Sequence, residues 1–270
     1  MRRISGDGVE LSVLDEGEGP AVLLLHGFPD SARLWHHQIP TLTDAGFRVV
    51  APDQRGFGES DKPQAIEAYG FGHLVSDVLA VLDDAGVERA HVVGHDWGAA
   101  VAWAVALLAP ERVDRLVALS VGHPSAFASR GIEQRRLSWY MLLFQFEEAE
   151  ALLRNDDWAL MREWAASHPE LEQAIEDLAR PGALTAALNW YRASLHPRSD
   201  LEQRGTLPLV QADTLGVFST GDAFLVEDQM SESGHHVAGE WRYERVEGAG
   251  HWFMLEQPER VSALLLDFLK

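Results

Sequence analysis

The sequence predicts an α/β protein in which a mostly parallel β-sheet is flanked by helices and interrupted by an inserted helical cap. Short apolar runs alternate with helical patterns toward both ends of the chain, which is typical of parallel strands joined by crossover helices. Between them, residues 125–207 show amphipathic helical stretches and no strand pattern. We therefore expect a core formed by residues 1–124 and 208–270 and a cap formed by residues 125–207.

The strands are predicted from apolar runs whose pattern depends on burial. Residues 9–14 alternate apolar and polar side chains, as in a half-solvated strand. Residues 21–25 are continuously apolar, as in a central strand that is buried on both faces. Similar runs predict the remaining strands, at residues 48–51, 90–93, 115–119, 215–218 and about 241–246.

Helical patterns fall between these runs, around residues 74–85, 98–108 and 258–269. The middle segment is divided into several helices by proline-containing pairs, among them His168-Pro169 and Pro181-Gly182. An insertion of this kind folds over the carboxyl ends of the strands, which is where open α/β sheets bind ligands. The sequence therefore predicts a binding cleft between the cap and the core.

The composition excludes several classes of function. The 270 residues include 42 acidic and 22 basic side chains, so the formal net charge is −20. This charge repels phosphate backbones and anionic lipid, and we expect neither a nucleic-acid nor a membrane partner. Because the chain has no cysteine, a thiolate nucleophile and a thiolate metal site are also excluded.

The location of the protein is predicted from its apolar segments. The N-terminus turns polar immediately, and no apolar stretch of signal-peptide length follows it. The most apolar run, residues 99–109, is far shorter than the roughly 20 residues that a membrane span requires. We expect a cytoplasmic protein that is a monomer or a homodimer.

The turn at residues 92–100 holds the most informative motif. Gly94 and Gly98 bracket Asp96 in a Gly-x-Asp-x-Gly pattern between a strand and a helix, which favours a sharp turn that projects the central side chain. Nucleophile elbows usually hold serine at this position, and no Gly-x-Ser-x-Gly occurs in the chain, so a serine esterase is disfavoured. The simpler interpretation is a turn in which Asp96 only caps the following helix.

Two further segments favour the catalytic interpretation. His26-Gly27-Phe28-Pro29 follows the apolar strand, where a second oxyanion-hole donor is expected. The two donors would be the backbone N–H groups of Phe28 and Trp97. Near the other end of the chain, His251 lies in a glycine-rich loop after the last strand.

A carboxylate completes this set. Asp222 follows the preceding strand, and the chain order Asp96, Asp222, His251 is that of nucleophile, acid and histidine in elbow-type hydrolases. Glu227 and Asp228 are alternatives, but Asp222 directly follows Gly221 at the predicted strand end, and we rank it first.

Together these segments resemble the α/β-hydrolases of the epoxide hydrolase family, of the soluble and microbial type, over essentially the whole chain. The motifs HGFP, DQRGFGESDKP, GHDWGA and GHW occur in order. The resemblance implies the α/β-hydrolase fold and the hydrolysis of an epoxide to a vicinal diol, with no cofactor and no metal. It further implies that Asp96 forms a covalent alkyl-enzyme ester, that His251 activates water as general base, and that Asp222 orients His251.

The leaving group of an epoxide is a basic alkoxide, which requires a hydrogen-bond donor, and tyrosine suits that task. Tyr140 and Tyr191 lie in the predicted cap, in contexts similar to those of the cap tyrosines that polarise the ring oxygen in epoxide hydrolases. On composition alone, both would be interpreted as core residues. We also expect Phe28, Trp97 and Trp252 to line an apolar pocket for a small epoxide.

The main alternative is a haloalkane or haloacid dehalogenase with the same Asp96 nucleophile. Haloalkane dehalogenases that resemble this chain often carry asparagine where Phe28 stands, and fluoroacetate dehalogenases carry arginines where Trp97, Ala100 and Val101 stand. A non-catalytic ligand-binding relative is a further alternative, because a fold does not establish a function. The paired histidines at 36–37 and 235–236 are expected to be solvated surface residues and not metal ligands.

Overall fold

One eight-stranded sheet forms the centre of the molecule, in a computed structural model that describes residues 1–129, 131–194 and 207–270. The spatial order is β1-β2-β4-β3-β5-β6-β7-β8. The first strands pair antiparallel, β1 with β2 and β2 with β4, and all other neighbours pair parallel. The strands are β1 (Arg2–Ser5), β2 (Glu10–Glu16), β3 (Ala21–Leu25), β4 (Arg48–Pro52), β5 (Ala90–His95), β6 (Val113–Leu119), β7 (Asp213–Ser219) and β8 (Trp241–Val246). The predicted α/β class is confirmed.

Strand burial follows the sequence pattern. All five residues of β3 are buried, since the strand lies between β4 and β5 with helices on both faces, whereas both ends of β2 are partly exposed. The edge strand β1 has no counterpart among the predicted strands. Only Ile4 of its four residues is buried, so its short sequence carries no recognisable alternation.

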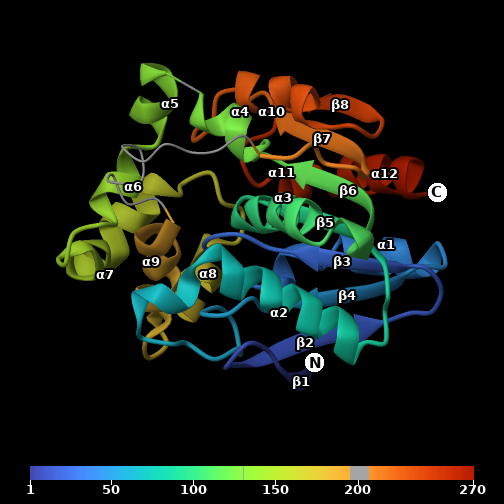
Figure 1. The fold of residues 1–270 in the computed structure, drawn as a ribbon. Helices are drawn as coiled ribbons and strands as arrows, with labels where there is room; N and C mark the ends of the chain where they lie inside the picture. Colours follow the sequence, from blue (N-terminus) through green and yellow to red (C-terminus); the bar gives the residue numbers. More distant parts are fainter. Residues whose placement is uncertain (130, 195–206) are drawn as a thin grey trace.

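Helices cover both faces of the sheet (Figure 1). Helices α2 and α3 pack against each other on one face, and α1, α11 and α12 form a second group on the other. The core helices are α1 (Gln38–Asp44), α2 (Phe71–Asp84), α3 (Trp97–Leu108), α10 (Asp228–Ser231), α11 (Phe253–Glu256) and α12 (Pro258–Leu269). Short 3₁₀ turns are η1 (Ala32–Trp35), η2 (Ile66–Tyr69), η3 (Pro110–Arg112) and η5 (Glu232–His236).

Between β6 and β7 the described chain is helical. Figure 1 shows α6, α7 and α9 beyond the end to which the arrow of β6 points, so the inserted helices lie at the carboxyl edge of the sheet. These helices are α4 (Pro124–Ala128), α5 (Ile132–Leu137), α6 (Trp139–Leu143), α7 (Ala149–Trp164, with non-helical backbone at 155–158), α8 (Leu171–Ala179) and α9 (Ala183–Ser194). We propose that residues 125–207 form the cap; residues 130 and 195–206 lie outside the described part of the chain.

The inserted helices share one apolar core with the sheet. Trp190 and Tyr191 of α9 are at most 2% exposed and belong to the same cluster of buried side chains as the central strands. Burial on this scale fixes α9 against the core, because each large side chain removed from water contributes about 1.5–3 kcal/mol. In the described residues, every helix is too short or too polar to cross a bilayer.

Candidate active site

A sharp turn between β5 and α3 presents Asp96. Its backbone has φ 54° and ψ −121°, which non-glycine residues rarely adopt and which marks stored strain. A Cβ on Gly94 would lie 2.2 Å from the carbonyl oxygen of Gly98, and one on Gly98 would lie 2.1 Å from that of Leu25. Both glycines are therefore required, since backbone packs directly against backbone at this turn.

The Asp96 side chain does not cap the helix that follows it. It makes no capping hydrogen bond to α3; instead, its Oδ1 accepts a 2.9 Å hydrogen bond from the backbone N–H of Phe28. The simpler interpretation of this turn is therefore wrong. The N–H of Trp97 lies in the first turn of α3, where backbone donors have no partner within the helix. These two amides are the donors expected for an oxyanion hole.

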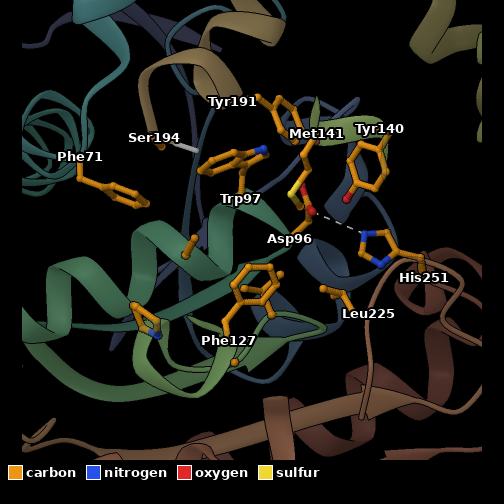
Figure 2. A pocket seen from close by; sticks show the side chains of 14 residues that line it. Phe71, Asp96, Trp97, Phe127, Tyr140, Met141, Tyr191, Ser194, Leu225 and His251 are labelled. Atoms are coloured by element: carbon orange, nitrogen blue, oxygen red, sulfur yellow. Dashed lines mark ion pairs between the residues drawn. The ribbon is translucent and has the colours of Figure 1, made fainter. Parts of the chain in front are cut away.

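His251 joins Asp96 to a second carboxylate. The ring Nε2 is 3.6 Å from Oδ2 of Asp96 (Figure 2). The ring Nδ1 is 2.7 Å from Oδ2 of Asp222. The side chain of Asp222 is fully buried, and its Oδ1 accepts from the amides of Phe224 and Leu225 at 2.8 and 3.1 Å. These hydrogen bonds fix the carboxylate, which in turn fixes the orientation of the imidazole ring.

The alternative acid Glu227 is engaged elsewhere. Its carboxylate accepts a hydrogen bond from the Tyr243 hydroxyl and pairs with Arg245. Asp222 is thus the carboxylate that the structure brings to the Nδ1 side of His251.

Electrostatics couple the three residues. Burial lowers the pKa of His251, but the carboxylates of Asp222 and Asp96 outweigh burial and raise this pKa to about 10. For Asp96, burial raises the pKa, but the hydrogen bond and charge of His251 outweigh burial and hold this pKa below its usual range. At neutral pH the pair is therefore an ionised carboxylate beside an imidazolium.

A largely apolar cavity of about 140 Å³ lies over Asp96, between the core and the inserted helices. Tyr140 from α6 and Tyr191 from α9 both line it, and in Figure 2 the Tyr140 hydroxyl points toward Asp96 and His251. The remaining lining residues are Phe71, Trp97, Ala100, Val121, Gly122, Pro124, Phe127, Met141, Ser194 and Leu225. The structure thus brings together all five residues for which the sequence predicted a catalytic role.

Both tyrosines stay protonated at neutral pH. Burial raises the pKa of Tyr140 well above its usual range, and the charges of Asp96 and Asp222 raise it further. Burial and the Asp96 charge act in the same direction on the pKa of Tyr191, while a hydrogen bond with the Trp97 side chain opposes them. Two neutral phenol donors therefore share a cavity with one carboxylate.

Known proteins resemble this chain over nearly its whole length. The family model described as "alpha/beta hydrolase fold" matches residues 20–258. Epoxide hydrolase A of Mycobacterium tuberculosis is 36% identical, over 99% of this chain and 96% of the relative. The chain belongs to the epoxide hydrolases of the α/β-hydrolase family.

Solved structures of epoxide hydrolases also superpose over the whole hydrolase. Epoxide hydrolase A from Mycobacterium thermoresistibile has a TM-score of 0.84 and 33% identity, covering 99% of this chain and 97% of that one. The F128A mutant of an epoxide hydrolase from Bacillus megaterium has a TM-score of 0.89 and 27% identity, covering 99% of both chains.

Two side chains expected to line the pocket are placed elsewhere in this hydrolase. Phe28 is 2% exposed and packs in the apolar core, in ring contact with Phe144 and Tyr191, and it is absent from the cavity wall. Trp252 is fully buried, and its indole N–H donates to Oδ2 of Asp30 at 3.1 Å. Trp97 is the one expected side chain of the three that lines the described cavity.

Most of the cavity wall comes from residues that the sequence motifs do not mark. Phe71, Phe127, Met141 and Leu225 come from four separate segments, and none of them lies in a motif. The available signal was weak: Met141 adjoins Tyr140, and Phe127 follows the predicted start of the cap. The pattern of an amphipathic helix does not distinguish an apolar side chain that lines a cavity from one that packs in a filled core.

The paired histidines differ from the expectation in part. His36, His37 and His235 are exposed, as expected. His236 is only partly exposed, because its ring stacks on the buried ring of His123 with centroids 4.4 Å apart. Within the described ranges, no three His, Cys, Asp or Glu side chains gather as a metal site.

Proposed function

We propose that this hydrolase opens an epoxide to a vicinal diol through a covalent ester on Asp96. The observation that carries the proposal is the shared cavity, in which an ionised carboxylate, a charged histidine and two protonated tyrosines meet. A carboxylate and phenol donors on opposite sides of one small space suit a ring that must be attacked at carbon and protonated at oxygen.

In the first step, an oxygen of Asp96 attacks an epoxide carbon, and the ring C–O bond breaks as the ester bond forms. The departing oxygen takes the electron pair of the broken bond, and the hydroxyls of Tyr140 and Tyr191 donate hydrogen bonds to it. One tyrosine supplies the proton that the oxygen gains. His251 does not act as a base in this step, because the Asp96 nucleophile is already ionised.

Once ester formation has removed the charge of Asp96, the imidazolium of His251 releases its proton to solvent, and it regains one when the Asp96 charge returns. In the second step, water attacks the ester carbonyl, and Nε2 of the neutral His251 accepts a proton from it. The amides of Phe28 and Trp97 stabilise the oxyanion of the tetrahedral intermediate. Asp222 holds the imidazole by its Nδ1 and stabilises the imidazolium that forms. Collapse of the intermediate releases the diol and restores the carboxylate, and the two protons of the consumed water complete the diol and reprotonate the tyrosine.

The cavity favours a neutral substrate with an apolar substituent. Its described lining contains no Lys or Arg side chain, and the charged His251 in the lining is already paired with Asp96 and Asp222. Aromatic and aliphatic side chains form most of the wall. The related Bacillus megaterium structure holds the product (R)-3-[1]naphthyloxy-propane-1,2-diol, which supports a diol product with an apolar group for this chain as well.

The location of the transferred oxygen tests this mechanism. A single turnover with enzyme in excess over a terminal aryl epoxide, in water enriched in ¹⁸O, is followed by mass spectrometry of the Asp96 peptide and of the diol. We expect ¹⁸O in the Asp96 carboxylate and none in the first diol formed, because the diol takes its new oxygen from Asp96. Label in the diol with none on Asp96 contradicts the covalent route.

The same protein with a 1-chloroalkane in place of the epoxide separates the two candidate reactions. We expect no catalytic release of chloride, whereas release at a rate comparable to epoxide hydrolysis favours the dehalogenase.

A further inference from the structure

Arg192, which follows Tyr191 in α9, has a guanidinium group with every donor occupied. Its Nε donates to the carbonyl oxygen of Phe144 at 2.9 Å, and one Nη2 donor reaches that of Phe146 at 3.1 Å. Glu150 accepts from both Nη atoms, at 2.7 and 2.8 Å, and Asn189 accepts from Nη1 at 3.2 Å. Five N–H groups thus have five acceptors, and none is left for a substrate.

Four of these five acceptors lie on one short segment of chain, and the fifth, Asn189, lies in α9 itself. Phe144 and Phe146 belong to the turn that leaves α6, the helix of Tyr140, and Glu150 lies in the first turn of α7. Arg192 therefore joins the helix that carries one tyrosine to the turn that follows the helix of the other. Only 11% of the Arg192 side chain is exposed, and a bidentate pair at this depth holds its geometry more firmly than a surface ion pair.

Gln145 lies in the turn after α6 and bonds back to α9, so it connects the same two helices as Arg192. Its side-chain amide donates to the carbonyl oxygen of Met141 in α6 and to that of Tyr191 itself, each at 3.2 Å. The ring of Phe144 packs against both tyrosines, with its centroid 5.5 Å from that of Tyr140 and 5.0 Å from that of Tyr191. Hydrogen bonds and ring packing thus both constrain the distance between Tyr140 and Tyr191.

We propose that Arg192 and Gln145 are positioning residues that fix Tyr140 and Tyr191 relative to one another. The inference rests on the proposed function, in which both hydroxyls must converge on a single ring oxygen. The centroids of the tyrosine rings lie 6.1 Å apart on two separate helices. Non-covalent contacts must set this distance, because the chain that connects residues 140 and 191 is too long to fix it. Displacing such a donor by about 1 Å can reduce a rate by about 100-fold.

The inference is tested by measuring which of the two steps, ester formation or ester hydrolysis, is slowed in a variant of Arg192. Arg192→Lys keeps the positive charge beside Glu150 but loses the planar fork that reaches two carbonyls at once. We expect formation of the Asp96 ester, followed by rapid quench and mass spectrometry, to slow about 10- to 100-fold. Hydrolysis of the ester is expected to keep its wild-type rate, because Asp222, His251 and the oxyanion amides all lie on the core.

Arg162→Lys is the matched control. Arg162 is another cap arginine with acidic partners, Asp157 and Glu172, and among the described residues it makes no hydrogen bond or ion pair with the turn after α6 or with α9. Both rates are expected to stay at the wild-type value in this variant. Gln145→Met, which removes two neutral hydrogen bonds and no charge, is the second test variant and is expected to slow ester formation by a smaller factor.

Two readouts separate failure of this inference from failure of the proposed function. The proposed function stands if the wild type forms the ester and the double variant Tyr140→Phe with Tyr191→Phe does not. In that case, the positioning role alone is overturned if Arg192→Lys and Gln145→Met both form the ester at the wild-type rate. Equal slowing of both steps also overturns it, since that indicates general loosening. If the wild type forms no ester, crystal structures decide: unchanged tyrosine positions in both variants overturn the inference, and a changed ring separation supports it.

Discussion

At the scale of single residues, His251 experiences two electrostatic environments during the proposed cycle. In the free protein, the charges of Asp222 and Asp96 hold its pKa at about 10, so the ring is charged at neutral pH and cannot accept a proton. Formation of the ester removes the charge of Asp96 and its hydrogen bond. The pKa of His251 then falls, and the ring can become a base in the step that requires one.

The two steps are therefore expected to respond differently to acid. Ester hydrolysis needs neutral His251 and should slow as the pH falls through the pKa that this residue has in the ester form. Ester formation needs only ionised Asp96, whose pKa lies below its usual range, and should continue. Rapid-quench mass spectrometry between about pH 5 and pH 9, on either side of the reference pKa of histidine, should show the ester accumulating toward low pH.

His251→Gln provides the control for this prediction. It should accumulate ester at every pH, with hydrolysis slower by about 10²- to 10⁴-fold, because it has no general base at any pH. An ester that builds up toward high pH in the wild type contradicts the assignment of the base.

At the scale of elements, the turn into α3 depends on close contact between backbones. A Cβ on Gly98 would lie 2.1 Å from the carbonyl oxygen of Leu25 on β3, which is fully buried and cannot move aside. The sheet and α3 must then separate, or the turn must change. Either response displaces Asp96 as well as lowering the free energy of unfolding.

Gly98→Ala should destabilise the protein by about 3 kcal/mol or more, as overpacking against rigid backbone does. Gly72→Ala is the matched control, because Gly72 is exposed in α2 and nothing lies within 4 Å of the position that its Cβ would take. Since alanine is the better helix former, this variant should gain about 0.5–1 kcal/mol. Urea unfolding followed by tryptophan fluorescence measures both; equal stability of the two variants contradicts the close contact.

At the scale of the whole molecule, charge works against compactness. The excess of acidic over basic side chains gives a net charge of −20, and self-repulsion of this kind destabilises the folded state. Salt screens such repulsion beyond about 8 Å at physiological ionic strength.

Raising the sodium chloride concentration from about 0.02 M to about 0.3 M shortens the screening length roughly fourfold. The Tm should then increase by at least about 2 °C, the shift that roughly 1 kcal/mol produces at this size. Choline chloride at the same ionic strength should give the same increase, because screening does not depend on the identity of the cation. An unchanged or lower Tm in both salts shows that repulsion is not a significant cost.

The sequence predicted the central strands well, because full burial leaves a continuous apolar run such as residues 21–25. It also predicted which motif residues would meet, since parallel strands bring the turns after them to one edge. It failed at β1, where one buried side chain in four gives no pattern, and at Trp252, whose indole meets Asp30 from a distant segment. Arg192 and Gln145 carried no signal either, because their partners are mostly backbone carbonyls, which every residue offers.

The sequence by itself determined the Gly-x-Asp-x-Gly motif around Asp96, the kinds of chemical group available and the alternation of strands and helices, because each depends on neighbouring residues. Only the tertiary structure decided how far apart Tyr140 and Tyr191 lie, which apolar side chains line the cavity, and that two carboxylates hold one imidazole in the charged state. Distances and pKa values arise from groups that are remote in the chain, and packing alone brings those groups together.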